Sequence, residues 1–345
     1  MKAGIYHGIK QVAVEQRDKP AIGPKDVLIQ VTYAGICGTD IGAYLHGGDA
    51  VGIYPGNEFG HEFVGIAAEV GAEVQGITKG MRLTINPTDR RSVETSGMNT
   101  TEIADMSGAF SQYVYVENAR LNKNVFRLPD TLPDEIAMLT EPLSVSMHAV
   151  NLSQATKGDK VLVYGAGAIG LSAVAALQYK GVTDIIVSDI NDFKLSFAKK
   201  LGAIPFNSNG KSLPEFVKQT WGTLKGNASE DTWNADVVLD CAGAPPILQE
   251  YMDNAKINST FVEVAINMRP SELSLFWLLA KETVIKGSRG YTPEDILQSI
   301  DALNQPDCKL KEIVTHTFPL EELPKAFEVG SNPNEAVKVA IKHSL

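Results

Sequence analysis

The segment at residues 160–191, KVLVYGAGAIGLSAVAALQYKGVTDIIVSDIN, constrains the fold of this chain more than any other segment. The apolar run KVLVY leads into GAGAIG at residues 165–170, which has the spacing G-x-G-x-x-G and opens an apolar stretch of helical length. The next apolar run, DIIVSD, ends at Asp189. A strand, a glycine turn, a helix and a second strand that ends in an acid predict the dinucleotide-binding unit of a doubly wound parallel sheet.

Each glycine of this motif has a physical role. Gly165 permits the tight turn, Gly167 lets a pyrophosphate approach because it has no Cβ, and Gly170 lets the helix and strand pack closely. The helix N-terminus supplies unpaired N–H groups and a positive dipole end for the phosphates. Asp189 can accept hydrogen bonds from the adenosine ribose and would repel a 2′-phosphate, which favours NAD(H) over NADP(H). The alternative, a glycine-rich turn in an unrelated α/β sheet, is disfavoured because strand, helix and acid agree.

The chain changes character near residue 155. Before it, strand-like runs bounded by glycines predict a mostly β half, at residues 26–37, 63–71, 80–85 and 110–116. A polar insert at residues 86–108 is predicted to be a surface loop or a small lobe. After residue 155, apolar runs alternate with segments of helical length, at residues 235–243, 259–267 and 283–290. This alternation predicts a parallel sheet covered by helices on both faces.

At roughly 100–200 residues per domain, a chain of 345 residues indicates two domains. We predict a β-rich domain over residues 1–152 and a dinucleotide-binding domain over residues 153–290. The short β elements after residue 291 resemble those of the first domain, so we expect residues 291–345 to complete it. The fold class is therefore α/β plus β.

Charge and cysteine content exclude several classes of partner. The formal net charge of −10 argues against nucleic acid and anionic membranes, because both need a positive protein face. No apolar run approaches the ~18 residues of a transmembrane helix, and the first residues lack the apolar centre of a signal peptide. Cys37, Cys241 and Cys308 are odd in number and widely spaced, which disfavours a disulfide framework and favours a cytoplasmic location.

Three residues near strand boundaries suit a metal ion. Cys37 lies in AGICGTD, and His61 and Glu62 lie in EFGHEFVG. A thiolate, an imidazole and a carboxylate are suitable zinc ligands, and a catalytic zinc needs three protein ligands and an open position. Glu141, in LTEPLSVSMHAV, supplies another acid at a predicted helix boundary. The alternative is that Cys37 is a buried cysteine that acts as a small hydrophobe. Glu58, in the same EFGHEFVG segment, is expected to be a solvated or structural residue beside the site.

The order and spacing of AGICGTD, GHEFVG, LTEPLSVSMHAV and GAGAIG resemble the zinc-dependent medium-chain dehydrogenase/reductase family. The similarity covers nearly the whole chain, and the polyol branch, with sorbitol and 2,3-butanediol dehydrogenases, is the nearest. The resemblance implies a GroES-like catalytic domain followed by a Rossmann domain. It also implies one catalytic Zn²⁺, NAD(H), a small alcohol or ketone substrate, and a homo-oligomer, either a dimer or a tetramer.

The resemblance also assigns roles to residues of this chain. Cys37 and His61 become zinc ligands, and Glu62 becomes a direct or exchanging ligand or a carboxylate that lies next to the metal. Glu141 binds the zinc directly, through water or in exchange with Glu62, and Thr39 passes on the proton of the alcohol. The expected cofactor contacts are Gly165, Gly167, Ala168, Ile169, Gly170, Asp189, Lys194, Ala242 and Gly243. Sorbitol dehydrogenases use an Arg-Tyr pair for the polyol. Arg289 and Tyr291 are candidates for that role, although their spacing differs by one residue, and a surface turn is the alternative.

Two departures from the family pattern change the expectations. Many relatives carry four close cysteines in the segment that matches residues 86–108, whereas this segment has none, so we predict no structural zinc. Gly42 stands where many relatives have a histidine that assists proton release. The proton route beyond Thr39 is therefore open between the cofactor ribose, water, Tyr44 and His46.

The predicted activity is hydride transfer between a secondary alcohol, either a polyol or a vicinal diol, and NAD. L-threonine dehydrogenase activity is the alternative within the same chemistry, and LSVSM after Glu141-Pro142 disfavours it because a glycine-asparagine pair is usual there. A zinc-free quinone reductase that uses NADPH is a second alternative, although such relatives lack the Cys37–His61 pair. A non-catalytic nucleotide-binding protein is a third.

Overall fold

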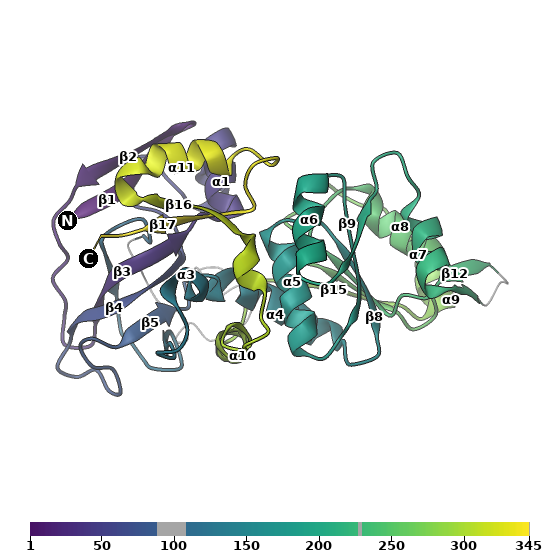
Figure 1. The fold of residues 1–345 in the computed structure, drawn as a ribbon, viewed down its shortest axis with the longest axis horizontal. Helices are drawn as coiled ribbons and strands as arrows, with labels where there is room; N and C mark the ends of the chain where they lie inside the picture. The colour runs from purple at the N-terminus through teal and green to yellow at the C-terminus, as the bar shows by residue number, and fades with distance from the viewer. Residues whose placement is uncertain (88–107, 227–229, 345) are drawn as a thin grey trace. The chain divides into compact units, whose positions relative to one another are not determined.

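The computed structural model describes residues 1–87, 108–226 and 230–344 (Figure 1). The chain divides into two compact units, one formed by residues 1–141 and 292–345 and the other by residues 142–291. The insert predicted at residues 86–108 lies almost entirely outside the described residues. Among the described helices, none combines the length and the apolar character that crossing a membrane requires.

The first unit is built on a seven-stranded sheet. Its strands are β3 (Val27–Gly35), β4 (Glu62–Val70), β5 (Arg82–Ile85), β6 (Tyr113–Val116), β7 (Val125–Arg127), β16 (Val314–Pro319) and β17 (Lys338–Lys342). Their order is β16-β17-β3-β4-β5-β7, and β6 also pairs with β3. A separate antiparallel hairpin joins β1 (Lys2–Gly8) to β2 (Gln11–Gln16). The four strand-like runs predicted before residue 155 are present as β3 to β6.

The C-terminal strands complete this first sheet. β17 pairs antiparallel with β3 and parallel with β16, so segments from the two ends of the chain share one sheet. The helical elements of the unit are α1 (Gly38–His46), η1 (Asp49–Val51), α3 (Asp134–Ala137), α10 (Pro293–Leu303), η3 (Leu310–Ile313), η4 (Leu320–Glu322) and α11 (Leu323–Gly330). In the core, the ring of Phe110 lies 4.9 Å from that of Phe59 and 5.7 Å from that of Phe327.

The second unit contains the predicted parallel sheet. Its strands are β8 (Lys160–Tyr164), β9 (Asp184–Asp189), β10 (Ile204–Asn207), β13 (Val237–Asp240), β14 (Thr260–Glu263) and β15 (Val284–Gly287). They are all parallel, in the order β10-β9-β8-β13-β14-β15. This order is that of the doubly wound dinucleotide-binding fold.

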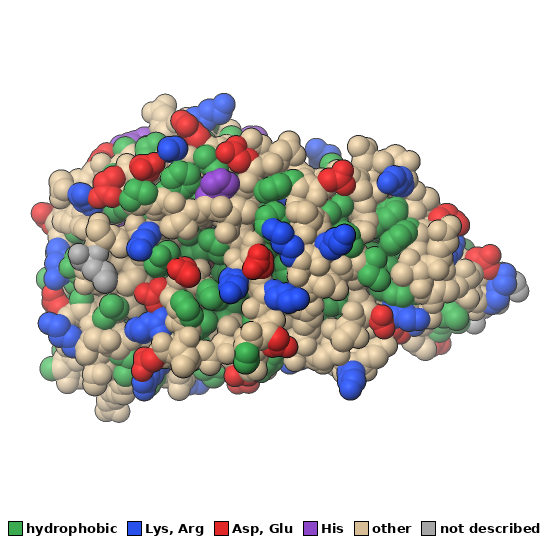
Figure 2. Space-filling view, in the orientation of Figure 1, with side chains coloured by type: hydrophobic (Ala, Val, Ile, Leu, Met, Phe, Trp, Pro, Cys, Tyr) green, Lys and Arg blue, Asp and Glu red, His purple; other side chains and the backbone are tan. Residues whose placement is uncertain are grey.

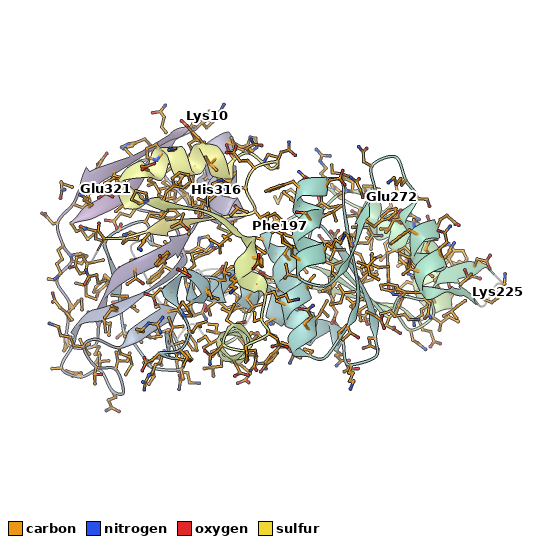
Figure 3. The ribbon with its side chains drawn as sticks, viewed as in Figure 1. Lys10, Phe197, Lys225, Glu272, His316 and Glu321 are labelled. Carbon is orange, nitrogen blue, oxygen red and sulfur yellow. The ribbon has the colours of Figure 1, made fainter. Side chains whose placement is uncertain are left out.

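Helices cover both faces of this sheet. They are α4 (Thr140–Ser153), α5 (Ala168–Tyr179), α6 (Asp192–Lys200), α7 (Leu213–Trp221), α8 (Pro246–Asn254) and α9 (Leu275–Lys281). α5 and α6 lie on one side of the sheet, and α7 and α8 lie on the other (Figure 1). A small hairpin, β11 (Thr223–Lys225) with β12 (Asp231–Trp233), projects from the unit with Lys225 near its tip (Figure 3).

The turn after β8 requires two of its glycines. Gly165 has a φ of +94°, where a side chain would be strained, and an added Cβ would lie 3.1 Å from the carbonyl of Cys241. A Cβ on Gly170 would lie 1.9 Å from the Gly165 oxygen. A Cβ on Gly167 would meet no atom within 4 Å. Gly165 and Gly170 are therefore needed by the fold, and the space beside Gly167 is free of protein atoms.

We expect Gly170→Ala to lower the free energy of unfolding by about 3 kcal/mol, because overpacking against fixed backbone forces the helix away from the strand. Gly167→Ala is the matched control and should change stability by less than about 1 kcal/mol, since its Cβ enters open space. Urea unfolding of both variants measures the difference. Equal destabilisation by the two substitutions would contradict this account of the turn.

Candidate active site

The sheet register of the first unit brings three potential metal ligands together. β3 and β4 are antiparallel, and Gly35 at the end of β3 faces Glu62 at the start of β4. Cys37 is separated from β3 by Ile36 alone and is the N-cap residue of α1, while His61 directly precedes β4. One ligand atom from each of Cys37, His61 and Glu62 lies within 4.8 Å of the others. A thiolate, an imidazole and a carboxylate in one group are chemically suited to a zinc ion.

A buried lysine holds the carboxylate of this group. Lys338 Nζ donates to Glu62 Oε1 at 2.8 Å and to Oε2 at 2.7 Å, and it also donates to the Ile36 carbonyl at 3.1 Å. The two side chains are only 2% and 1% exposed. Each carboxylate oxygen has two lone pairs, so Glu62 can bind a cation while it accepts from Lys338. Lys338 thus holds the Glu62 carboxylate beside Ile36, the residue that precedes Cys37.

Sequence reasoning missed Lys338 and Gly35. A Cβ on Gly35 would lie 2.3 Å from Glu62 Oε2, so this glycine provides the room for the carboxylate. The sequence does contain one signal for a buried ion pair at Lys338. This lysine begins the apolar run KVAI, and charged residues rarely occupy buried positions without a partner.

The electrostatics of the group favour a cation. Burial lowers the pKa of His61, but the charge of Cys37, a hydrogen bond with it, and the charges of Asp40 and Glu141 outweigh burial, so the pKa lies well above 6.5. Burial raises the pKa of Asp40 to about 6, although the charge of His61 and a hydrogen bond from the Cys37 N–H oppose it. The negative field that favours a proton on His61 would also favour a divalent ion among these side chains.

Glu141 lies in the first turn of α4. Its ligand atoms are outside the group of Cys37, His61 and Glu62, but its charge contributes to the raised pKa values of His61 and Lys338. For Lys338, burial lowers the pKa, and the charge of Glu62, then that of Cys37, raises it by more. The structure therefore brings three of the four predicted ligands together and places the fourth within electrostatic reach.

The candidate proton route begins at Thr39. Its Oγ1 is buried and has no hydrogen-bond partner, and Asp40 Oδ1 beside it is also unpartnered. An unpaired buried hydroxyl costs free energy unless a ligand completes it. Tyr44 is buried and its ring lies 5.4 Å from that of Phe327, whereas His46 is exposed at the end of α1. The route beyond Thr39 stays a prediction.

The predicted cofactor residues of the second unit surround the carboxyl ends of its central strands. Gly167 caps α5 without a side-chain hydrogen bond, so the first N–H groups, including those of Ala168, Ile169 and Gly170, are available to an anion. Asp189 at the end of β9 accepts from the N–H groups of Ala166 at 2.7 Å and Asn191 at 2.9 Å.

Lys194 lies in the first turns of α6, the helix that follows Asp189. The order of the strands reverses between β8 and β13, which is where such sheets bind their ligands. Asp189 keeps free lone pairs for a ribose hydroxyl.

The loop after β13 is held by the last residue of that strand. Asp240 Oδ1 accepts from the N–H groups of Ala242 at 2.9 Å and Gly243 at 2.8 Å. Glu263 lies opposite Asp240 on β14, and burial, together with the charge of Asp240, raises its pKa to about 7. Glu263 was also missed from the sequence, where an acid inside the run STFVEVAIN was its only signal.

The two predicted substrate residues lie in the second unit. Arg289 is exposed just after β15, and Tyr291 is 3% exposed. The metal-ligand group lies in the first unit. Contact of Arg289 and Tyr291 with a substrate therefore stays a prediction.

Two family models match the chain. The alcohol dehydrogenase GroES-like domain matches residues 23–130, and the zinc-binding dehydrogenase domain matches residues 168–305. Sorbitol dehydrogenase of Halalkalibacterium halodurans is 31% identical, with 99% of each chain covered. L-threonine 3-dehydrogenase of Edwardsiella ictaluri is 30% identical with 90% of each covered, and (R,R)-butanediol dehydrogenase of Bacillus subtilis is 30% identical with 94% of each covered.

Solved structures agree with this fold. An alcohol dehydrogenase of Escherichia coli CFT073 complexed with NADH has a TM-score of 0.85 at 27% identity, with 99% of each chain covered. A protein of Sinorhizobium meliloti 1021 named as a zinc-binding dehydrogenase and bound to NADP has a TM-score of 0.81 at 26% identity, over 99% of this chain and 98% of that one. The predicted combination of a GroES-like domain with a Rossmann domain is confirmed.

The fold and the matched domains define the class of protein as zinc-dependent oxidoreductases of the alcohol dehydrogenase type. Within that class, the chain belongs to the medium-chain dehydrogenase/reductase family, as its sequence motifs predicted.

We expect Lys338→Met to lower the free energy of unfolding by about 3–5 kcal/mol, because it leaves the Glu62 carboxylate buried without its partner. The double variant Lys338→Met/Glu62→Gln should recover part of this loss, since it removes the charge as well. Lys2→Met is the matched control, because it breaks the exposed ion pair with Glu321 and should cost no more than about 1 kcal/mol. Urea unfolding of the three variants measures these changes in the free energy of unfolding. A loss in Lys338→Met no greater than that in Lys2→Met would contradict the role of the buried ion pair.

Proposed function

We propose that this chain is a zinc-dependent oxidoreductase that transfers a hydride between a secondary alcohol, a polyol or vicinal diol, and NAD. The observation that carries the proposal is the convergence of Cys37, His61 and Glu62, whose ligand atoms lie within 4.8 Å of one another. This group lies in a chain of the zinc-dependent dehydrogenase family that also contains a dinucleotide-binding sheet.

In this proposal, Cys37 and His61 hold one zinc ion per chain, and Glu62 and Glu141 act as direct or exchanging carboxylate ligands. Zinc bound there supplies a Lewis acid that polarises an alcohol or carbonyl oxygen. Lys338 keeps Glu62 oriented through two hydrogen bonds. The unpartnered Thr39 hydroxyl accepts a hydrogen bond from the substrate hydroxyl and passes its proton outward. No second, structural zinc is proposed, because the chain has only three cysteines.

The second unit supports the cofactor part of the proposal. A nicotinamide cofactor bound there supplies the hydride acceptor. The α5 N-terminus binds the pyrophosphate, Asp189 and Lys194 bind the adenosine ribose, and the Ala242–Gly243 backbone lines the cofactor site. The negative charge of Asp189 supports NAD over NADP. In domain terms, we propose a catalytic domain of residues 1–152 with 291–345 and a cofactor domain of residues 153–290.

The substrate class rests on the named relatives. Sorbitol and butanediol dehydrogenases, similar over 94–99% of this chain, support a polyol or vicinal diol, and we propose Arg289 and Tyr291 as substrate contacts. L-threonine 3-dehydrogenase is similar over 90% of the chain and supports the second candidate. The LSVSM segment after Pro142 disfavours threonine. We further propose a cytoplasmic homo-oligomer, a dimer or a tetramer.

Removal of the Cys37 thiolate tests the metal assignment. We expect Cys37→Ala to lose the bound zinc and at least about 1,000-fold in kcat, because the ion that stabilises charge at the reacting oxygen is lost. Cys308→Ala is the matched control and should retain both. Metal content is measured by mass spectrometry, and NADH formation is followed with sorbitol, xylitol, 2,3-butanediol, threonine and simple secondary alcohols. Full zinc content and turnover in Cys37→Ala would refute the assignment, and a flat response of the wild type across the panel would refute the substrate class.

Cofactor preference depends on the charge of Asp189. We expect Asp189→Asn to raise the ratio of kcat/KM with NADP⁺ to kcat/KM with NAD⁺ by about 10-fold or more, since repulsion of a 2′-phosphate is removed. Asp192→Asn is the control, because Asp192 is an exposed acid nearby whose carboxylate accepts from Asn207. A ratio that is unchanged by Asp189→Asn, or changed equally by Asp192→Asn, would contradict the role of Asp189.

A further inference from the structure

Glu263 is an acid at the end of an otherwise apolar strand of the second unit. It is the last residue of β14, and Phe261 and Val262 before it are buried. Its Oε1 atom is also buried and, among the described residues, has no hydrogen-bond partner. A buried carboxylate oxygen without a partner costs free energy, which makes Glu263 a candidate for a role in function.

A second carboxylate lies beside Glu263. β13 and β14 are parallel, and Asp240 at the end of β13 is directly opposite Glu263. On its other side, Asp240 is directly opposite Tyr164 at the end of β8. Residues directly opposite each other in a sheet have their side chains on the same face, so these three side chains form one row. We call Asp240 and Glu263 the carboxyl pair.

The groups that face the carboxyl pair add no positive charge. Tyr164 donates its hydroxyl to Glu250 Oε1 of α8 at 2.7 Å, so α8 contributes another acid. On β15, the residue opposite Glu263 is Gly287, which has no side chain. Burial and the charge of Asp240 raise the pKa of Glu263 to about 7, and no lysine or arginine of the described chain opposes them.

The basic residues that follow β14 in the sequence are engaged elsewhere. Lys286 faces the other side of the sheet by alternation, and its amine donates to the Leu152 carbonyl at 2.7 Å. The Lys281 amine donates to the Met252 carbonyl at 2.7 Å, and Arg289 is exposed. By contrast, the face shown in Figure 2 carries red acidic and blue basic side chains interspersed across it. The carboxyl pair is therefore a concentration of negative charge without a basic neighbour.

This pair is connected directly to the loops at the carboxyl edge of the sheet. Asp240 Oδ1 accepts from the N–H groups of Ala242 and Gly243, and the Asp240 carbonyl accepts from those of Val264 and Ala265. A doubly wound sheet of this type consists of two mononucleotide-binding halves. The glycine turn and β9 belong to the half that binds the adenosine. The half with β13 and β14 is therefore the one that receives the nicotinamide.

The two oxidation states of the cofactor differ in charge at the nicotinamide. The ring of NAD⁺ is a cation, whereas the ring of NADH is neutral because it has accepted a hydride. Carboxylates in a site with little water act over several ångströms, since the effective dielectric constant is low there. A carboxyl pair without a basic neighbour therefore stabilises bound NAD⁺ and has little effect on bound NADH.

We propose that Asp240 and Glu263 are specificity-determining residues that make the cofactor site favour the oxidised nicotinamide over the reduced one. The inference rests on the proposed binding of NAD and adds a preference between its two oxidation states. Because the pKa of Glu263 is about 7, this side chain is mostly neutral at lower pH and mostly charged at higher pH. The preference for NAD⁺ that Glu263 provides is therefore present above that pH and is lost as the pH falls.

The ratio of the Kd for NADH to the Kd for NAD⁺ measures this preference. Fluorescence of bound NADH and its displacement by NAD⁺ give both constants for the zinc-loaded protein. At pH 8, Glu263→Gln should lower the ratio at least about 5-fold, because it removes a charge and keeps the shape of the side chain. At pH 6, where Glu263 already carries a proton, the same substitution should change the ratio by less than about 2-fold.

Two further variants complete the comparison. Asp240→Asn at pH 8 should also lower the ratio at least about 5-fold, since asparagine removes the charge but keeps an oxygen that can accept from the loop N–H groups. Asp184→Asn is the matched control, because Asp184 is an exposed acid at the start of β9, at the opposite edge of the same sheet. It should leave the ratio within about 2-fold at both pH values.

Urea unfolding provides a readout of the fold itself. At pH 8, Glu263→Gln should raise the urea concentration at the midpoint, because a buried carboxylate with a raised pKa destabilises the folded state at high pH. A ratio unchanged by Glu263→Gln or Asp240→Asn at pH 8, an equal effect of Glu263→Gln at pH 6, or an equal effect of Asp184→Asn would overturn the inference and leave the proposed function intact. A wild type that binds neither NAD⁺ nor NADH would overturn both.

Discussion

The buried ion pair between Lys338 and Glu62 is the interaction on which the candidate metal centre depends. A lysine amine with almost no exposure needs strong compensation for its lost hydration. It receives this compensation from both oxygens of Glu62 and from the Ile36 carbonyl. The same three contacts connect β17, β4 and the segment that leads to Cys37. The position of the candidate ligands is therefore determined by the C-terminal part of the chain as much as by the motifs that contain them.

A comparable constraint organises the second unit around backbone groups. Asp240 uses its side chain to hold the N–H groups of Ala242 and Gly243, and its carbonyl accepts from Val264 and Ala265. One residue at the end of β13 thus shapes the loops after two neighbouring strands. These loops lie at the carboxyl edge of the parallel sheet, beside the turn of Gly165, where dinucleotides bind in folds of this type.

Short segments of the sequence predicted those helices, strands and turns whose structure is determined by residues within the segment itself. The segment 160–191 predicted β8, α5 and β9 correctly, since apolar strands, glycine geometry and helix length are all encoded within it. The run at 259–267 was predicted as one strand, but β14 ends at Glu263 because the next two N–H groups turn towards the Asp240 carbonyl. Cys37, His61 and Glu62 were predicted as metal ligands because thiol, imidazole and carboxylate side chains can be recognised in the sequence as groups that bind zinc. Lys338 was missed because it meets Glu62 across a sequence separation of 276 residues, and only the β17–β3 register brings it there.

The way in which β16 and β17 join the first sheet has a consequence for the order of folding. Residues 142–291 form the second unit without a break, and all of them leave the ribosome before either of these strands does. Domains generally fold as units while synthesis proceeds. The parallel sheet can therefore close first, while the earlier-made first sheet still lacks two strands and Glu62 still lacks its lysine. The unit that begins at the N-terminus is thus completed last, so a nascent chain would acquire its nucleotide-binding fold before its metal-binding one.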